Sequence, residues 1–254
     1  MRRLKIGKSQ IEVWPNAHVI ALRAAELFVE TAMQSVEERD SFKVALSGGS
    51  TPRALYGLLT RGSFLSSMPW EKTQVFWSDE RCVPPTSEES NYRMAFDAML
   101  RHVPVRPEQV HRMRGEDEPD EAARSYSQLL REKFDESPPR FDLILLGLGE
   151  DCHTASLFPH SPAILDADNL VSAPYVEKLK AHRLTLTFPV INEAASVIFL
   201  VAGESKADAL SIVLEEEVSG MDYPAQLVSP TQGNLLWLVD EAAAARLTQF
   251  EEET

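Results

Sequence analysis

Cysteine is scarce in this sequence of 254 residues, which contains Cys82 and Cys152 and no others. Two cysteines are too few for the disulfide framework of a small secreted protein, so we expect reduced thiols in a cytoplasmic protein. The N-terminal segment also lacks the apolar run of a signal sequence, because charged and polar residues interrupt it. No stretch approaches the apolar length that crosses a membrane.

Positive charge is in deficit as well, with 25 Lys and Arg against 39 Asp and Glu and a formal net charge of -14. This balance argues against nucleic acid or an anionic membrane as the main partner. An anionic small molecule can still bind where a few cations gather. The six histidines lack short metal-ligand spacings to cysteines or carboxylates, so the sequence supports no metal site.

Hydrophobic residues make up 44% of the chain, enough for a substantial core, and no linker divides it. Apolar strands alternate with helical stripes. This alternation predicts βαβ units and therefore a single α/β domain over 1–254, with a doubly wound, mostly parallel sheet and helices on both faces, a Rossmann-like arrangement. The expected strands are 42–46, 73–77, 143–146, 183–187, 196–201 and 234–239, with 110–113 as a short edge strand. The expected helices are 17–39, 54–59, 91 to about 101, 119–134, 207–216 and 241–247.

Polar clusters follow four of these strands, at Ser47–Thr51, Asp79–Arg81, Gly147–Thr154 and Gly203–Lys206. The carboxyl ends of parallel strands share one edge of an open sheet, where ligands bind. We therefore expect the four clusters to form one pocket.

The first cluster, composed of Ser47, Gly48, Gly49, Ser50 and Thr51, offers backbone amides and hydroxyls at a helix N-terminus. Phosphate binding requires these groups, although a tight turn with a Ser/Thr helix cap has the same composition. Lys206, and Arg183 on an exposed strand face, would supply matching positive charge. Taken singly, each is more often a solvated surface cation.

The second cluster places Asp79 and Glu80 beside Arg81. In the functional interpretation Arg81 binds or polarises a substrate that an acid orients. The alternative is an ion-paired surface loop.

His153 is the candidate general base, because imidazole titrates near neutral pH, and Asp151 could orient it. The alternative is a structural or solvated histidine. A nucleophilic pair of Cys152 and His153 is disfavoured, because adjacent side chains tend to diverge.

Together these residues resemble the 6-phosphogluconolactonase family, within the superfamily that includes the glucosamine-6-phosphate deaminases. The matching pieces come in the family's order: Ser47–Pro52, Asp79–Pro84 with Ser90-Asn91, Gly147–Gly149 through His153–Pro159, Arg183–Thr185, and Gly203–Lys206. The deaminases share the glycine turn and the Asp-Gly-His core. The continuation Thr154–Pro159 is similar to the lactonase branch. One departure is Cys152, which stands where the family usually has Gly; a positive φ there would cost about 1 kcal/mol.

The resemblance implies hydrolysis of 6-phospho-D-glucono-1,5-lactone in the oxidative pentose phosphate pathway, without metal or other cofactor. It implies His153 as the base acting on water, Asp151 as its orienter and Arg81 as a ligand of the oxyanion or of substrate hydroxyls. Substrate and phosphate binding would fall to Ser47–Thr51, Asp79, Arg183 and Lys206.

Two alternatives stay open at this point, a glucosamine-6-phosphate deaminase-like isomerase and a non-catalytic sugar-phosphate sensor. The partner expected in each case is a small sugar phosphate, bound by a monomer or small homo-oligomer.

Overall fold

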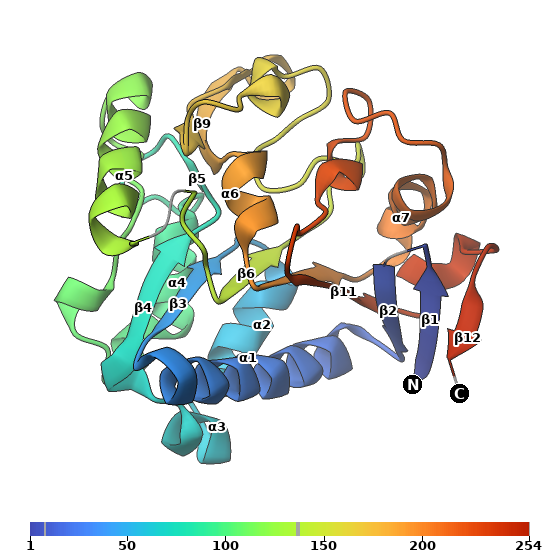
Figure 1. Ribbon diagram of the computed structural model, residues 1–254, viewed down its shortest axis with the longest axis horizontal. Coiled ribbons are helices and arrows are strands. Elements are labelled where there is room, and N and C mark those ends of the chain that lie inside the picture. The colour runs from blue at the N-terminus through green and yellow to red at the C-terminus, as the bar shows by residue number, and fades with distance from the viewer. Residues whose placement is uncertain (8, 136–137, 254) are drawn as a thin grey trace.

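A central eight-stranded sheet organises the protein, seen in a computed structural model that describes residues 1–7, 9–135 and 138–253 (Figure 1). Its strands are β1 (Arg2–Ile6), β2 (Ser9–Trp14), β3 (Phe42–Leu46), β4 (Thr73–Trp77), β6 (Leu143–Leu146), β10 (Ser196–Val201), β11 (Asn234–Asp240) and β12 (Glu251–Glu253). They lie in the order β12-β1-β2-β11-β10-β6-β3-β4. From β2 to β4 all neighbours pair in parallel, while β1 is antiparallel to both β2 and β12. The expected doubly wound, mostly parallel sheet is confirmed.

Strand β6 shows how the sequence produces this sheet. Its four residues, Leu143 to Leu146, are all fully buried, and it pairs in parallel with β3 on one side and β10 on the other. An unbroken aliphatic run is what a strand covered on both faces requires. The loop that follows β6 therefore leaves the sheet at its middle.

The helices are α1 (Ala17–Arg39), α2 (Ser50–Leu59), α3 (Gly62–Ser67), α4 (Asn91–Ala98), α5 (Pro119–Lys133), α6 (Phe188–Glu193) and α7 (Ala207–Glu215). Figure 1 shows α1, α2 and α3 on one side of the sheet and α5, α6 and α7 on the other. Helix α1 begins where Asn16 Oδ1 accepts hydrogen bonds from the amides of His18 and Val19. It ends at Arg39, as the apolar periodicity predicted, and Asp40 follows in the left-handed conformation.

A second, antiparallel sheet lies beside the carboxyl edge of the first and was not predicted. It consists of β5 (Asp79–Arg81), β9 (Ala181–Leu186) and β7 (Val171–Ser172), and β8 (Tyr175–Val176) pairs with β9. Asp79–Arg81 is thus a strand, and its register places Arg81 opposite Arg183. Three-residue strands carry too little pattern to be recognised along the chain.

Two predicted elements are corrected by the structure, and strand β12 was not predicted. Val110–Met113 is no strand, since Val110 makes a single parallel bridge to Val75. The expected terminal helix over 241–247 is wrong, because the structure has a 3-10 turn there, Ala243–Arg246. The Asp240 carboxylate accepts a hydrogen bond from the Ala243 amide at the start of this turn. After this turn the chain forms the unpredicted strand β12, which pairs with β1.

One continuous cluster of buried hydrophobic side chains joins both sheets, and Trp77, Trp237 and Tyr56 are among its largest fully buried members. This continuity supports the expectation of one domain. Among the described helices, none has both the length and the apolar character needed to cross a bilayer.

Candidate active site

Two adjoining cavities open at the carboxyl edge of the central sheet. The first, the turn cavity, has a volume of about 330 Å³ and includes the whole of Ser47–Thr51 in its wall. The second, the hairpin cavity, has a volume of about 390 Å³ and includes Asp151, Lys178 and Arg183. Both cavities are lined by Asp79, Arg81, Gly149, His153, Ala155 and Lys206. The four polar clusters therefore converge as expected.

The glycine turn connects β3 to α2 and leaves polar groups without protein partners. Gly49 precedes the helix with φ of 114°, a conformation that favours glycine, and no side chain caps the helix. The Ser/Thr-cap alternative is therefore wrong. Ser47 Oγ is buried with no hydrogen-bond partner among the described residues. Free amides and an unpaired hydroxyl at a helix N-terminus suit an anionic ligand.

Asn91 lies directly over this turn, and a Cβ added to Gly48 would come within 2.0 Å of Asn91 Oδ1. The side-chain amide of Asn91 donates hydrogen bonds to two oxygens of Asp79, the backbone carbonyl at 3.0 Å and the carboxylate Oδ1 at 3.2 Å. The other Asp79 oxygen accepts from Ser156 Oγ at 2.7 Å. Asp79 is thus held in a defined orientation at the wall of both cavities.

Glu80 holds Arg81 and the start of α4 in place through hydrogen bonds. Its buried carboxylate accepts hydrogen bonds from the amides of Arg81, Asn91 and Tyr92 at 2.7 to 2.8 Å and from Ser90 Oγ at 3.0 Å. Burial raises the pKa of Glu80, and these four bonds oppose the rise. The carboxylate binds the N-terminus of α4 instead of the Arg81 guanidinium, so the ion-paired-loop alternative is wrong.

His153 occupies space that Gly149 leaves open. Its Nδ1 lies 2.5 Å from Asp151 Oδ1, and its ring stacks on Phe158 with centroids 4.1 Å apart at 22°. Because Nδ1 faces the carboxylate, Nε2 is the nitrogen available to the cavities. The hydrogen bond to His153 is the main cause that lowers the pKa of Asp151, and Lys178 lowers it further.

Cys152 adopts φ of 63°, so this position has the left-handed backbone that favours glycine. The loop nevertheless closes, with Gly149 N donating to His153 O at 2.8 Å and Cys152 N donating to Gly149 O at 3.1 Å. The Cys152 side chain is 2% exposed, and its Sγ lies 3.8 Å from Ala209 O. Burial raises the thiol pKa to about 11. Cys152 points away from the cavities and forms no nucleophilic pair with His153.

The three predicted cations take different places. Lys206, at the end of the 3-10 turn Glu204–Lys206, and Arg81, which donates to Glu89 O at 2.6 Å, line both cavities. Of the two cavities, Arg183 lines only the hairpin cavity. Its side chain is half-buried, which corrects the expectation of an exposed strand face. Burial lowers the pKa of Arg183, and repulsion from Arg81 across the β5–β9 pair lowers it further.

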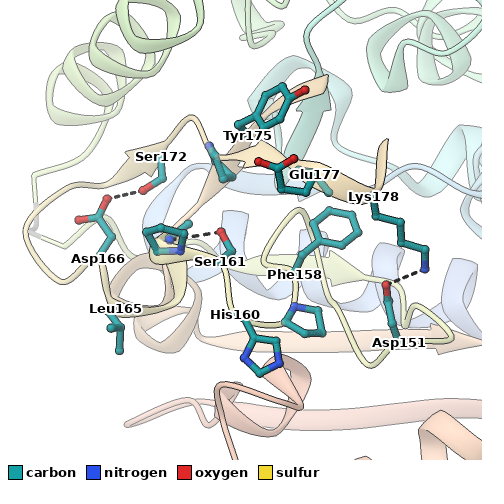
Figure 2. A pocket seen from close by; sticks show the side chains of 15 residues that line it. Asp151, Phe158, His160, Ser161, Leu165, Asp166, Ser172, Tyr175, Glu177 and Lys178 are labelled. Atoms are coloured by element: carbon teal, nitrogen blue, oxygen red, sulfur yellow. Dashed lines mark hydrogen bonds and ion pairs between the residues drawn. The ribbon is translucent and has the colours of Figure 1, made fainter. Parts of the chain in front are cut away.

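A third cavity, the outer cavity, lies on the far side of Asp151 and Lys178 (Figure 2). Its volume is about 1000 Å³, and Phe158, Leu165 and Tyr175 give it a largely apolar wall. It shares Asp151, Phe158 and Lys178 with the hairpin cavity. Nothing in the sequence pattern indicated it.

Three residues of the site were not among the predicted ones: Asn91, Phe158 and Lys178. Asn91 and Phe158 belong to the segments that carried the family resemblance, which was the available signal. Lys178 had no such signal, because it lies outside every segment that carried the resemblance. Within the described residues, no three His, Cys, Asp or Glu side chains are grouped to hold a metal ion.

Comparison with known proteins shows the family to which the chain belongs. Residues 15–237 match the family described as glucosamine-6-phosphate isomerases/6-phosphogluconolactonase. A 6-phosphogluconolactonase from a Synechocystis species is 41% identical over 94% of this chain and 98% of its own length. A 6-phosphogluconolactonase from a Nostoc species is 39% identical over 95% of this chain and 99% of its own length. The structure of 6-phosphogluconolactonase from Trypanosoma brucei superposes with a TM-score of 0.84 at 26% identity, covering 96% of this chain and all of that one. The chain therefore belongs to the glucosamine-6-phosphate isomerase/6-phosphogluconolactonase family, as the sequence motifs indicated.

Proposed function

We propose that this protein is an enzyme that hydrolyses 6-phospho-D-glucono-1,5-lactone to 6-phospho-D-gluconate, in the oxidative pentose phosphate pathway. The observation that carries the proposal is the position of His153. Its imidazole, bonded through Nδ1 to Asp151, lines the same cavity as Arg81, Lys206 and the Ser47–Thr51 turn. The names of the full-length relatives support the same substrate.

The phosphate is assigned to the Ser47–Thr51 end of the turn cavity. The amides at the start of α2 and the unpaired hydroxyl of Ser47 would donate to its oxygens, and Lys206 would neutralise charge. Arg183 faces the adjoining hairpin cavity opposite Arg81. An anionic substrate would relieve the repulsion between these two guanidinium groups, so Arg183 remains part of the proposed binding set.

The lactone ring then lies between His153 and Arg81. Nε2 of His153 takes a proton from water as the water oxygen bonds to the lactone carbonyl carbon, and Asp151 stabilises the imidazolium that forms. Arg81 stabilises the negative charge on the former carbonyl oxygen. When the ring C–O bond breaks, the imidazolium returns its proton to the leaving oxygen, which becomes the C5 hydroxyl. Asp79 would accept hydrogen bonds from substrate hydroxyls.

A lactone is an activated ester, so this scheme requires neither metal nor other cofactor. The formal charge of -14 disfavours nucleic acid or an anionic membrane as partner, and Arg81, Arg183 and Lys206 supply the local positive charge that a small anion needs. We propose a cytoplasmic monomer or small homo-oligomer.

The proposal is tested by lactone turnover of the purified protein, measured as proton release from fresh substrate and corrected for spontaneous opening. We expect a rate well above the spontaneous one. Ammonia release from glucosamine 6-phosphate without lactone turnover would assign the protein to the deaminase side of the family. Tight binding of 6-phosphogluconate without turnover of either substrate would make it a sensor.

A further inference from the structure

Asp151 uses both of its carboxylate oxygens. Oδ1 lies 2.5 Å from His153 Nδ1, and Oδ2 accepts from Lys178 Nζ at 3.1 Å. Figure 2 shows the lysine side chain extending to the carboxylate along the boundary of the outer cavity. The three side chains form a continuous chain from Lys178 through Asp151 to His153.

The two ends of this chain come from different sheets. Asp151 and His153 follow β6 of the central sheet, whereas Lys178 lies in the 3-10 turn Glu177–Leu179 between β8 and β9. The same β8–β9 hairpin carries Arg183. The Lys178–Asp151 ion pair therefore connects two parts of the site. One is the hairpin that carries Arg183, a proposed substrate ligand, and the other is the carboxylate that orients the proposed base.

Exposure alone would make this contact weak. The Lys178 side chain is 71% exposed, and exposed ion pairs contribute little to folding stability. Its partner Asp151 is 26% exposed, however, and contacts a histidine at the wall of the hairpin cavity. A ligand in the hairpin cavity would displace water from beside the pair, and a charge pair with less water around it interacts more strongly.

We propose that Lys178 is a positioning residue that acts through Asp151 on His153. It holds the plane of the carboxylate, and with it the imidazole orientation that leaves Nε2 facing substrate. It also offsets part of the negative charge of Asp151, so that His153 stays unprotonated, and able to act as a base, to a lower pH. This role rests on the function proposed above.

The other charges around His153 decide the sign of the effect. The walls of the hairpin cavity contain the acids Asp79, Glu150 and Asp151, and the cations Arg81, Lys178, Arg183 and Lys206. Removing Lys178 takes away a cation and frees Asp151 to interact with the imidazolium alone. Protonation of His153 then becomes easier, and the acid limb of the pH–rate profile moves to higher pH.

The test compares Lys178→Gln, Lys178→Arg and Lys178→Glu with wild type, using the pH dependence of kcat and KM and an NMR titration of the His153 ring. We expect the midpoint of the titration and of the acid limb to rise by about half a pH unit in Lys178→Gln. The rise should be larger in Lys178→Glu and close to zero in Lys178→Arg. At a pH on the acid limb, kcat of Lys178→Gln should fall about three-fold with little change in KM.

The matched control is Lys180→Asn, which removes the same charge two residues away. Lys180 is exposed and left-handed at φ of 48°, a conformation that asparagine accepts. We expect no shift in this control. An unmoved His153 titration in Lys178→Gln, or an equal shift in Lys180→Asn, would overturn the proposal. So would a raised KM at constant pH midpoints, which is the signature of direct substrate binding by Lys178.

The titration of the imidazole does not depend on turnover. If wild type fails to open the lactone but the His153 midpoint still shifts in the order Arg, Gln, Glu, the proposed function fails and the coupling survives. If wild type is active and the midpoint stays constant across the series, the coupling fails and the function survives.

Discussion

A Cβ placed on Gly149 would lie 2.0 Å from Nδ1 of His153 and 2.7 Å from Oδ1 of Asp151. The imidazole and the carboxylate that holds it therefore occupy the space in which any other residue would have its side chain. Gly149 cannot move away easily, because its amide donates to His153 O at 2.8 Å and its carbonyl accepts from the Cys152 amide.

Gly149→Ala is expected to displace the imidazole and to lower kcat by about 100-fold, since small misplacements of a catalytic group have effects of this size. The control is Gly57→Ala, because a Cβ on Gly57 meets nothing within 4 Å. That change should leave kcat unaltered and stabilise α2 by roughly 0.5 to 1 kcal/mol. Lactone turnover and thermal unfolding measure the two effects, and full activity in Gly149→Ala would contradict the placement of His153.

His153→Ala removes the proposed base and should lower the lactone rate by roughly 10²- to 10⁴-fold, the usual contribution of general-base catalysis. Initial proton release with fresh lactone provides the measurement. The control is His102→Ala, at an exposed histidine in the 3-10 turn Leu100–His102, which should remain fully active. Equal rates for wild type and His153→Ala would remove the assigned base.

Lys206→Ala tests the phosphate end of the turn cavity. Lys206 has Glu150 Oε1 as a distant partner at 4.0 Å, so its ammonium group is available to a ligand. We expect KM to rise by roughly 10-fold or more with a small change in kcat, because a cation that holds a phosphate equally in ground and transition states contributes to binding alone. Lys72→Ala, which breaks an exposed pair with Asp40, is the control. A fall in kcat at constant KM would place Lys206 at the reacting carbonyl instead.

Glu80→Gln should destabilise the fold and loosen the site together. The carboxylate accepts four hydrogen bonds, and a glutamine amide offers one oxygen and an NH₂ group that faces the same donors. Loss of these bonds should lower the free energy of unfolding by about 2 to 4 kcal/mol. Urea denaturation measures the change, with the exposed Glu88→Gln as control. Wild-type stability in Glu80→Gln would show that the buried carboxylate contributes nothing.

The Cys152 thiol should resist alkylation while the protein is folded. Burial raises its pKa to about 11. At pH 8.5 about 0.3% of such a thiol is thiolate, against about half of a free cysteine. Mass spectrometry after iodoacetamide treatment should find Cys152 unmodified in native buffer and modified in urea. Rapid native modification with loss of activity would show that the side chain reaches the cavities.

The sequence alone determined the order of the main elements and the chemistry of the site. Helix α1 over Ala17–Arg39 and the strands β3, β4, β6, β10 and β11 of the central sheet follow from apolar runs and periodicity, which are local properties. His153, Asp151 and the glycine turn were recognisable because each follows a buried strand, and parallel strands end at one edge. Strands β5 and β12 were missed because three residues have no period to detect, and β1 and β2 were missed because charged and polar residues interrupt their apolar pattern.

Only the tertiary structure decided how these groups face one another. It divided the site into two cavities with Arg183 in one of them, buried the Cys152 thiol, and brought Lys178 from a separate hairpin to Asp151. Such contacts depend on the register of β9, which pairs with β8 in a local hairpin and with β5 about a hundred residues away in the sequence. A pattern read along the chain records which face a residue occupies, and it holds no information about which distant residue shares that face.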